Sequence, residues 1–375
     1  MNPLDELATI LRPAGGGLYL VSTGKAEQQQ LQQRLYGAKS DIEVQQKFRD
    51  ALSGIGKARG VMLGIPSDVG AGFQRGSNLG PQAIRTKLLE DPQWPAEMKS
   101  LGLIDVGDVF VIPQVQHDDM LSPDQLRRSR EALYPNVSEG ERAALPVSPL
   151  SIAERAWRLI FQLNPHVKPF ALGGDHSTAL PGVQALQLAM VARGEQRPWG
   201  IVQPDAHTDL LEHRLGVKYC FATWSWHANE LLGRQQRLTQ VGIRASGRTQ
   251  QHWESTLAVR QFWAADILRE PAKALDEVIS HLKSTGVHGV YFSNDIDGTD
   301  SKYADATGTP EPNGLEPDWV LQLIDRLGAD IGLLGGDVME VAPSLTRTPQ
   351  SAERTVSLAA QYFKRTLVAA LGSAA

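Results

Sequence analysis

The sequence has few of the features that mark secreted, membrane or nucleic-acid-binding proteins. It holds one cysteine, Cys220, in 375 residues, so no internal disulfide can form and a reducing compartment is indicated. No run of about eighteen apolar residues occurs, so no membrane span is expected. The formal net charge of −5 argues against a nucleic-acid partner. Residues 1–11 contain Asp5 and Glu6 and lack the basic start and apolar core of an export signal. We therefore expect a soluble, cytoplasmic protein that binds neither nucleic acid nor membrane.

Nucleotide-binding motifs are also missing. A glycine-rich loop precedes a predicted helix that has Pro81 near its start, and such a loop could hold a phosphate group. The sequence contains neither the lysine pattern of a P-loop nor the G-x-G-x-x-G motif, so we discount a phosphate site there.

What the sequence does have is a regular alternation of apolar, strand-like runs and helix-length segments. With 42% hydrophobic residues, the chain can build one large α/β domain or two ordinary ones. Helix-length segments such as 149–163 and 271–285 separate most of the runs, which predicts an eight-stranded, mainly parallel sheet with helices on both faces. The predicted strands are 60–66, 103–106, 168–172, 199–203, 238–243, 259–263, 289–293 and 331–334.

We divide the chain into an N-terminal helical arm at 1–58 and one α/β domain at 59–375. In the arm, residues 26–35 and 40–52 can each form a helix after a glycine break at 15–17. We expect the arm to pack on the domain or on a neighbouring subunit and assign it no chemistry. In the domain we expect an insertion at 118–149 and a closing amphipathic helix at 352–371.

Acidic residues and histidines follow three of the predicted strands. The motif GGDHS occupies 173–177, DAHTD occupies 205–209 and SNDIDGTD occupies 293–300. Because alternate residues of a strand turn to one side, Asp205, His207 and Asp209 would converge about 6–7 Å apart. Parallel α/β sheets gather their ligands at the C-terminal ends of the strands, so the three motifs can meet there. Their side chains are of the kinds that bind metal ions.

The three motifs, in this order along the chain, resemble the signatures of the ureohydrolases, the arginase and agmatinase superfamily. Two later segments strengthen the resemblance: ATGTP at 306–310 with NGL at 313–315, and DVMEVAP at 337–343. The resemblance covers residues from about 59 to 343. It implies a three-layer arginase-like α/β fold and a homotrimer or homohexamer.

The resemblance also implies a site for two divalent metal ions. Charge leads to the same expectation, since four carboxylates in one pocket cannot all ionise without cations. The family mostly uses Mn²⁺ and some members use Ni²⁺, and imidazole and carboxylate ligands suit such ions better than structural Zn²⁺. The resemblance implies that His176 and Asp209 hold the first ion, His207 and Asp297 hold the second, and Asp205 and Asp295 bridge both.

The reaction implied is hydrolysis of a guanidinium C–N bond by a metal-bridging hydroxide. Two metal ions lower the pKa of a shared water toward about 7, and Asp209 would accept a hydrogen bond from the hydroxide. Glu340 corresponds to the family's guanidinium-binding glutamate, because a carboxylate in a dry site can bind this planar, forked cation bidentately. Thr307, in the ATGTP segment, is a further predicted substrate contact.

The loop after the DAHTD motif departs from the family pattern. Ureohydrolases commonly carry there a His-Gly pair whose histidine shuttles a proton to the leaving group, and residues 210–228 contain no such pair. We predict His227 as the shuttle, with His213 or an unidentified residue as alternatives. Cys220 is not expected to act as a nucleophile, because the dinuclear site already supplies one.

Aromatic residues occupy this loop where arginase has a polar motif for an amino-acid head group. Trp224 and Trp226 would put aromatic surface near the pocket, which suits a small cation stripped of water, although packing in the core or at an interface would explain them as well. The long arm, the loop CFATW at 220–224 and GGD at 335–337 resemble the guanidinase branch, whose members hydrolyse free guanidine and use nickel.

Three functions stay open at this point. The first is hydrolysis of guanidine to urea and ammonia, and the second is hydrolysis of a longer guanidino compound such as agmatine, 4-guanidinobutyrate, arginine or homoarginine. A pocket rim closed by Trp224 and Trp226 would favour the first, and an open channel with a charged mouth would favour the second. The third is a metal-free binding or regulatory protein.

Overall fold

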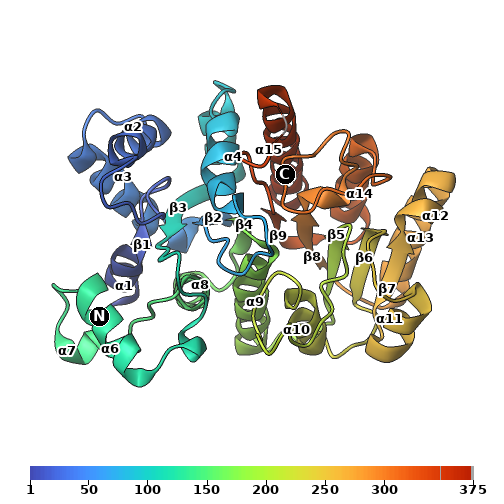
Figure 1. Cartoon of the computed structure of the whole chain (residues 1–375), viewed down its shortest axis with the longest axis horizontal. Helices are drawn as coiled ribbons and strands as arrows, with labels where there is room; N and C mark the ends of the chain where they lie inside the picture. Colours follow the sequence, from blue (N-terminus) through green and yellow to red (C-terminus); the bar gives the residue numbers. More distant parts are fainter. Residues whose placement is uncertain (347, 373–375) are drawn as a thin grey trace.

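The computed structural model describes residues 1–346 and 348–372. Within these residues, nine strands form one sheet: β1 (Leu11–Arg12), β2 (Gly60–Ile65), β3 (Leu103–Val109), β4 (Lys168–Gly173), β5 (Gly200–Pro204), β6 (Leu238–Ile243), β7 (Arg260–Trp263), β8 (Val290–Asp295) and β9 (Leu333–Met339). They lie in the order β1-β3-β2-β4-β9-β8-β5-β6-β7 (Figure 1). Every neighbouring pair is parallel except β1 with β3.

All eight predicted strands are present, but the predicted number is one too low. The additional strand, β1, has two residues and pairs antiparallel with β3 through Leu11 opposite Val109 and Arg12 opposite Asp108. So short a strand leaves no alternating pattern that the sequence could reveal. The last strand runs to Met339, beyond its predicted end at residue 334. The prediction ended too early because two glycines interrupt the apolar run.

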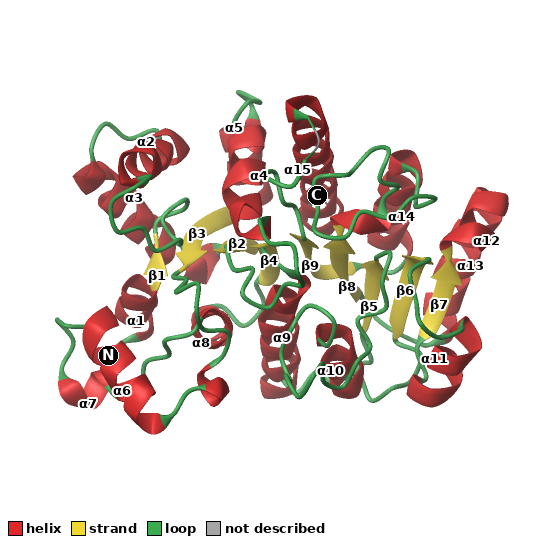
Figure 2. Cartoon of the chain, viewed as in Figure 1, coloured by secondary structure: helices red, strands yellow, loops and turns green. Residues whose placement is uncertain are grey.

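Helices cover both faces of the sheet, as predicted (Figure 2). One layer contains α4 (Gly80–Leu88), α5 (Trp94–Leu101), α12 (Ala264–Arg269), α13 (Pro271–Ser284), α14 (Pro317–Asp330) and α15 (Pro349–Leu371). The other contains α1 (Pro3–Ile10), α8 (Pro149–Leu163), α9 (Leu180–Ala192), α10 (Trp224–Leu231) and α11 (Gln250–Leu257). The predicted C-terminal helix is α15, and the predicted insertion holds α6 (Pro123–Leu133) and α7 (Glu139–Arg142). None of the described helices is long and apolar enough to span a bilayer.

The N-terminal arm packs on the rest of the chain. Both predicted helices exist, as α2 (Lys25–Tyr36) and α3 (Asp41–Ser53), and α1 precedes them. Leu7 and Ile10 of α1 are fully buried in the larger hydrophobic core. The backbone N–H of Gly15 donates to the Asp108 carboxylate at 2.7 Å, which ties the arm to β3. The arm also supplies β1, so it is part of the sheet, and the boundary at residue 58 stays a prediction.

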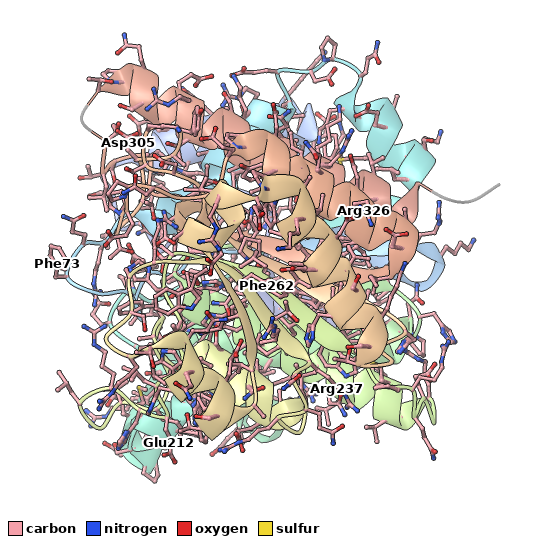
Figure 3. The ribbon with its side chains drawn as sticks, turned by 90° about the vertical axis from the view of Figure 1, so that its right-hand side faces the viewer. Phe73, Glu212, Arg237, Phe262, Asp305 and Arg326 are labelled. Atoms are coloured by element: carbon pink, nitrogen blue, oxygen red, sulfur yellow. The ribbon has the colours of Figure 1, made fainter. Side chains whose placement is uncertain are left out.

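The centre of the sheet sets the place of the candidate site. Strands β4, β9, β8 and β5 are adjacent, and their C-terminal ends all face one edge. The short 3-10 helices η4 (His176–Ala179) and η5 (Ile296–Gly298) begin just after β4 and β8. The loop at 66–76, which follows β2, runs above this edge, and Phe73 projects outward from it with 87% of its surface exposed (Figure 3).

Candidate metal centre

Two of the three motifs turn into 3-10 helices directly after their strands. The Asp175 side chain accepts the N–H of Ser177 at 3.0 Å, and the Asp295 side chain accepts the N–H of Asp297 at 2.9 Å. An aspartate that caps a helix in this way satisfies a backbone donor that would otherwise lack a partner. These turns direct the following side chains, His176 and Asp297, back over the edge of the sheet.

His176 lies at the centre of a first group of ligands. Its Nδ1 is 3.0 Å from Asp295 Oδ2, 3.3 Å from Asp205 Oδ2 and 3.5 Å from Asp209 Oδ2. The structure therefore brings the two residues expected at the first ion, His176 and Asp209, together with both expected bridges. Side-chain atoms of His176, Asp205 and Asp295 are close enough to one another to hold a single cation.

His207 lies at the centre of a second group. Its Nδ1 is 3.1 Å from Asp297 Oδ2 and 3.7 Å from Asp205 Oδ1. Asp205 thus faces both histidines, one with each carboxylate oxygen, as a bridging ligand would. Asp295 faces His176 through Oδ2, while its Oδ1 accepts the N–H of Asp297.

The chemistry of this cluster fits a pair of divalent cations. Asp205, Asp209, Asp295 and Asp297 are at most 6% exposed. Among the ion pairs of residues 1–346 and 348–372, neither lysine nor arginine reaches any of these four carboxylates. Buried carboxylates are stable when they are paired or coordinate metals, and among the described residues the ion pairs of these four carboxylates are with two imidazoles only. The donors are all nitrogen and oxygen, which suits Mn²⁺ or Ni²⁺.

The protonation of the cluster in the absence of cations reflects this crowding of charge. Burial raises the pKa of Asp209 well above its usual range, and the charge of Asp205 adds to the effect. Burial and the neighbouring charge of Asp297 do the same to the pKa of Asp295. Burial alone would lower the pKa of His207, but the Asp297 and Asp205 carboxylates raise it to about 12.

Two site residues adopt the left-handed backbone conformation that most side chains avoid. Asp209 has φ of 52° and Glu340 has φ of 62°. Aspartate tolerates this region moderately well, whereas a glutamate there costs energy that the surrounding structure must offset. The backbone N–H of Glu340 donates to the Gly174 carbonyl at 2.8 Å, and the Glu340 carboxylate accepts a hydrogen bond from the backbone N–H of His176 at 3.0 Å. These contacts hold Glu340 over the metal-ligand cluster.

Glu340 has the environment expected of a cation-binding group. It follows β9 directly, and 8% of its surface is exposed. Burial, followed by the charges of Asp295 and Asp175, raises its pKa well above the usual range. In the described part of the chain no basic side chain forms an ion pair with it. A Cβ atom added at Gly308 would lie 4.0 Å from Glu340 Oε2, which places this glycine, one of the lining residues of a neighbouring cavity, beside the carboxylate.

Trp224 is closer to the cluster than the sequence predicted. Its indole stacks on the His176 ring, with centroids 4.4 Å apart and an interplanar angle of 25°. Its Nε1 donates to Asp209 Oδ2 at 3.1 Å. The side chain is 1% exposed, so Trp224 forms an inner wall of the cluster and takes no part in a rim.

Several residues that contact the predicted ligands were not predicted from the sequence. Ser293 Oγ lies 3.0 Å from His176 Nε2 and donates to Asp337 Oδ1 at 2.9 Å. The Ser293 hydroxyl donates its only proton to Asp337, so toward His176 the Ser293 oxygen can act only as an acceptor. His176 Nε2 then carries a proton, and the lone pair of His176 Nδ1 is available to a metal ion. Thr309 Oγ1 donates to Asp297 Oδ2 at 3.0 Å. Strand alternation could have revealed Ser293, which stands two residues before Asp295 on the same side of β8.

The predicted proton shuttle lies away from these contacts. His227 Nε2 is 3.0 Å from the Lys218 carbonyl, and its ring contacts Tyr219 and Trp226 at centroid distances of 5.4 and 4.9 Å. Burial lowers the pKa of His227. Within the described residues, neither His227 nor its alternative His213 forms a hydrogen bond or ion pair with the ligand carboxylates. The shuttle assignment stays a prediction, and Trp226 lies with His227 rather than over the cluster.

A cavity of about 970 Å³ opens beside the cluster. Thr307 and Thr309 are among its lining residues, together with Lys302 and Glu311, which bring charges of both signs. The Thr307 hydroxyl is buried and, among the described residues, has no hydrogen-bond partner, so it is available to a ligand. Glu311 Oε1 lies 4.0 Å from His207 Nε2. The cavity thus has charged side chains, as expected of the mouth for a longer substrate, but neither Glu340 nor any of the six predicted ligands is among its lining residues.

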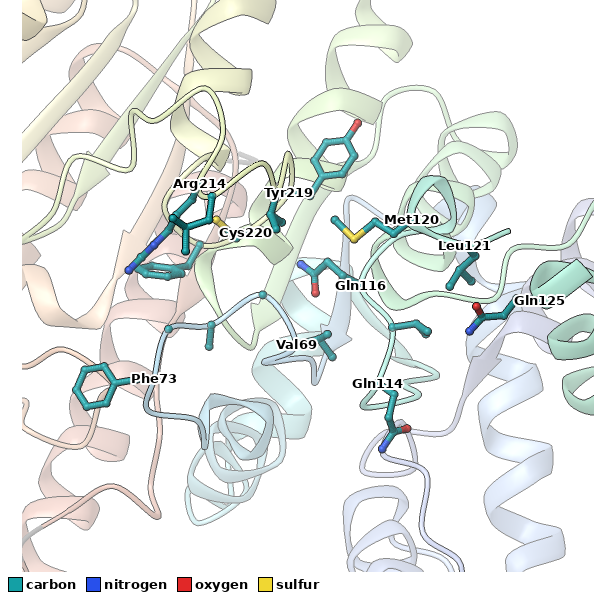
Figure 4. A pocket seen from close by; sticks show the side chains of 17 residues that line it. Val69, Phe73, Gln114, Gln116, Met120, Leu121, Gln125, Arg214, Tyr219 and Cys220 are labelled. Atoms are coloured by element: carbon teal, nitrogen blue, oxygen red, sulfur yellow. The ribbon is translucent and has the colours of Figure 1, made fainter. Parts of the chain in front are cut away.

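A second cavity, of about 510 Å³, lies on the other side of the loop at 66–76 (Figure 4). Gln116, Tyr219 and Cys220 line it, and the Gln116 side chain donates to Ser177 Oγ at 2.8 Å. Burial raises the pKa of the Cys220 thiol. The thiol is therefore poorly suited to act as a nucleophile, in keeping with the expectation from the sequence.

Comparison with known proteins places these features in a family. The profile of the Arginase family matches residues 58–368. The mitochondrial agmatinase of Gallus gallus is 31% identical over 293 residues, which cover 75% of this chain and 73% of the relative. The guanidinobutyrase of Pseudomonas aeruginosa is 28% identical over 295 residues, covering 76% of this chain and 79% of the relative.

A solved structure gives the same result for the fold. The agmatine ureohydrolase of Thermoplasma volcanium superposes with a TM-score of 0.61 at 26% identity, covering 85% of this chain and 92% of that one. The predicted three-layer, mainly parallel α/β architecture is thereby confirmed.

Proposed function

Because the chain belongs to the arginase family, we propose that it hydrolyses a guanidinium C–N bond and releases urea at a centre of two divalent metal ions. The observation that carries this proposal is the position of Glu340. A buried carboxylate that has no basic partner among residues 1–346 and 348–372 lies beside a cluster that can hold metal ions, and its backbone is held in an unfavourable conformation. Such a group suits a substrate that brings its own permanent positive charge.

The metal ions would be held by the residues predicted from the family motifs. When bound, they supply a water molecule that is acidic enough to attack at neutral pH. Mn²⁺ and Ni²⁺ both suit the nitrogen and oxygen donors. The proposed ligands are His176, Asp205, His207, Asp209, Asp295 and Asp297.

The chain's own residues orient the substrate and move the protons. Glu340 would bind the guanidinium group and hold its carbon over the cluster, with the Thr307 hydroxyl as a second contact. Asp209 Oδ2 accepts from Trp224, so its other oxygen is free to take the proton of the attacking water. Transfer of that proton to the departing nitrogen breaks the C–N bond. The hydroxyl proton of the intermediate leaves as well, so the guanidinium cation and water would give urea and ammonia in its protonated form, ammonium.

Guanidine is the first candidate substrate because of Trp224. This buried indole lies against His176 and Asp209, so it would place an aromatic side chain next to the site of attack. Aromatic faces favour small cations that have lost their hydration shell.

A longer guanidino compound is the second candidate, and the cavity beside Thr307 favours it. That cavity carries charged side chains at its wall, which could bind the far end of an extended substrate. The matched relatives include proteins named for agmatine and guanidinobutyrate. Trp224 and Trp226 do not close a rim over the site, so the structure leaves this route open.

One set of assays separates the candidates. Purified protein is loaded with Mn²⁺ or Ni²⁺, its metal content is measured, and urea release is followed with guanidine, agmatine, 4-guanidinobutyrate and arginine. We expect the highest kcat/KM with guanidine. A higher value with a longer compound would overturn that choice, and metal binding without urea release from any of the four would overturn the hydrolase itself. Protein that binds no metal would support the binding-protein alternative. The proposed homotrimer or homohexamer is tested by its mass in solution.

A further inference from the structure

Three glutamines lie side by side in the interior of the sheet. Gln203 on β5 is the register partner of Gln240 on β6, which is the register partner of Gln261 on β7. All three side chains have no exposed surface. Strands of a parallel sheet covered by helices usually carry apolar residues at such positions, and buried amides are costly unless their hydrogen bonds are made.

The three amides form one continuous chain of hydrogen bonds. Gln261 Nε2 donates to Gln240 Oε1 at 2.8 Å, and Gln240 Nε2 donates to Gln203 Oε1 at 2.8 Å. At the inner end, Gln203 Nε2 donates to Asp205 Oδ2 at 2.7 Å. At the outer end, Trp263 Nε1 donates to Gln261 Oε1 at 3.0 Å. We call these three glutamines the glutamine ladder.

The groups at its ends fix the direction of the ladder. The indole N–H of Trp263 can only donate, so the atom of Gln261 that faces it is the oxygen. The Asp205 carboxylate can only accept, so the atom of Gln203 that faces it is the nitrogen. Gln240 is fixed in addition by the Thr208 carbonyl, which accepts from its Nε2 at 2.6 Å. Every amide therefore points its donor toward the cluster, and aligned hydrogen bonds polarise one another.

The ladder acts on the carboxylate that is shared by the two groups of ligands. Asp205 Oδ1 accepts a hydrogen bond from the backbone N–H of His207 at 2.6 Å, and Asp205 Oδ2 accepts one from the side chain of Gln203. These two donors hold the carboxylate so that one oxygen faces His176 and the other faces His207. Three other carboxylates, Asp209, Asp295 and Asp297, face the same two histidines.

We propose that the glutamine ladder positions the Asp205 carboxylate for metal binding and thereby sets the metal affinity of the centre. This inference rests on the proposed metal centre. Gln203 is the residue in direct contact with Asp205, and Gln240 and Gln261 act through it. Ligating carboxylates depend on hydrogen-bonded partners of this kind, whose loss typically weakens metal affinity about 10-fold to 100-fold.

The test measures metal affinity directly and does not depend on turnover. Mn²⁺ is titrated calorimetrically into metal-free wild-type protein and into Gln203→Met, Trp263→Phe and Thr239→Val. Thr239 is the control, since it is buried on β6 next to Gln240 but points to the opposite face of the sheet. The melting temperature of each metal-free variant is recorded in parallel.

We expect the Kd for Mn²⁺ to rise about 10-fold to 100-fold in Gln203→Met and to stay at the wild-type value in Thr239→Val. Trp263→Phe removes only the outermost donor, so its Kd should rise about twofold to fivefold. If Gln203→Met does not fold, Trp263→Phe carries the test, because Trp263 lies two amides away from Gln203.

Unchanged Kd values together with lower melting temperatures in the ladder variants would overturn the proposal, because the ladder would then serve the fold alone. A wild-type protein that binds no divalent metal would instead overturn the metal centre itself. The two failures are distinguishable, since the first occurs in variants of a protein that binds metal.

Discussion

The imidazole of His176 lies against the indole of Trp224, with the two ring centroids 4.4 Å apart, and the same indole donates a hydrogen bond to Asp209. One aromatic side chain thus restrains two proposed metal ligands that come from different strands. It does so from the first turn of α10, in the loop where the sequence departs from the common ureohydrolase pattern.

Replacing Trp224 by phenylalanine should separate these two contacts. Trp224→Phe keeps a ring against His176 but removes the N–H that fixes Asp209 Oδ2. We expect kcat to fall about 10-fold to 100-fold, as is typical when a partner of a metal ligand is lost. The matched control is Trp319→Phe on α14, a buried indole whose Nε1 donates to the Pro271 carbonyl outside the site, and it should change kcat less than about threefold. Equal losses in the two variants would contradict this role of Trp224.

Removing the charge of Glu340 should weaken guanidinium binding and leave the metal centre intact. Loss of one partner of a buried charge pair costs about 2–5 kcal/mol, so kcat/KM of Glu340→Gln should fall at least about 30-fold. Metal content, measured by elemental analysis, should equal that of the wild type. The control is Glu277→Gln on α13, because this carboxylate is 53% exposed, screened by solvent and outside the site. A Glu340→Gln variant with wild-type kcat/KM would exclude Glu340 as the substrate clamp.

Metal affinity should increase with pH. Without metal, the neighbouring carboxylates raise the pKa of His176 well above its usual value and that of His207 to about 12, although burial opposes both shifts. At neutral pH both rings therefore hold a proton that a metal ion must displace, and binding releases protons. The Kd should fall by up to about tenfold per pH unit for each displaced proton. Calorimetry at pH 6.5, 7.5 and 8.5, in buffers of different ionisation enthalpy, measures the slope and the protons released. An affinity independent of pH would contradict the proposed histidine ligands.

Removal of metal should lower thermal stability. A ligand that binds only the folded protein stabilises it by about 2.7 kcal/mol at a concentration 100 times its Kd. Bound cations would also relieve the repulsion among four buried carboxylates. We expect dialysis against a chelator to lower the melting temperature by a few degrees and added Mn²⁺ or Ni²⁺ to restore it. Glu340→Gln should respond to metal as the wild type does, since Glu340 is not a proposed ligand. If neither chelator nor added metal changes the melting temperature of the wild type, the result would argue against the proposed metal centre.

Much of the fold could be predicted because its signals are local. Apolar runs mark the eight longer strands, and the alternation of Asp205, His207 and Asp209 shows which side chains share a side. Strand β1 has only two residues and is defined by its pairing with β3, so no local sequence pattern predicts it.

The parts of the site that escaped prediction depend on which strands become neighbours. Gln203, Gln240 and Gln261 each look unremarkable in their own strands, and only the order β5-β6-β7 places them in one row. The same holds for Trp224, which the sequence placed only near the pocket. Its burial against His176 follows from the packing of α10 beneath the sheet edge, and sequence spacing carries no information about that packing.

The proposed ligands and substrate clamp come from four strands that are adjacent in space but far apart along the chain. His176 and Glu340, joined by a hydrogen bond, are separated by 164 positions. The last of these strands in sequence, β9, inserts between β4 and β8, so the middle of the sheet closes only after nearly the whole chain has been made. Contacts this distant form late, since their loops must close first. Uptake of cations would therefore report that folding is complete, and a chain still emerging from the ribosome would have no centre to fill.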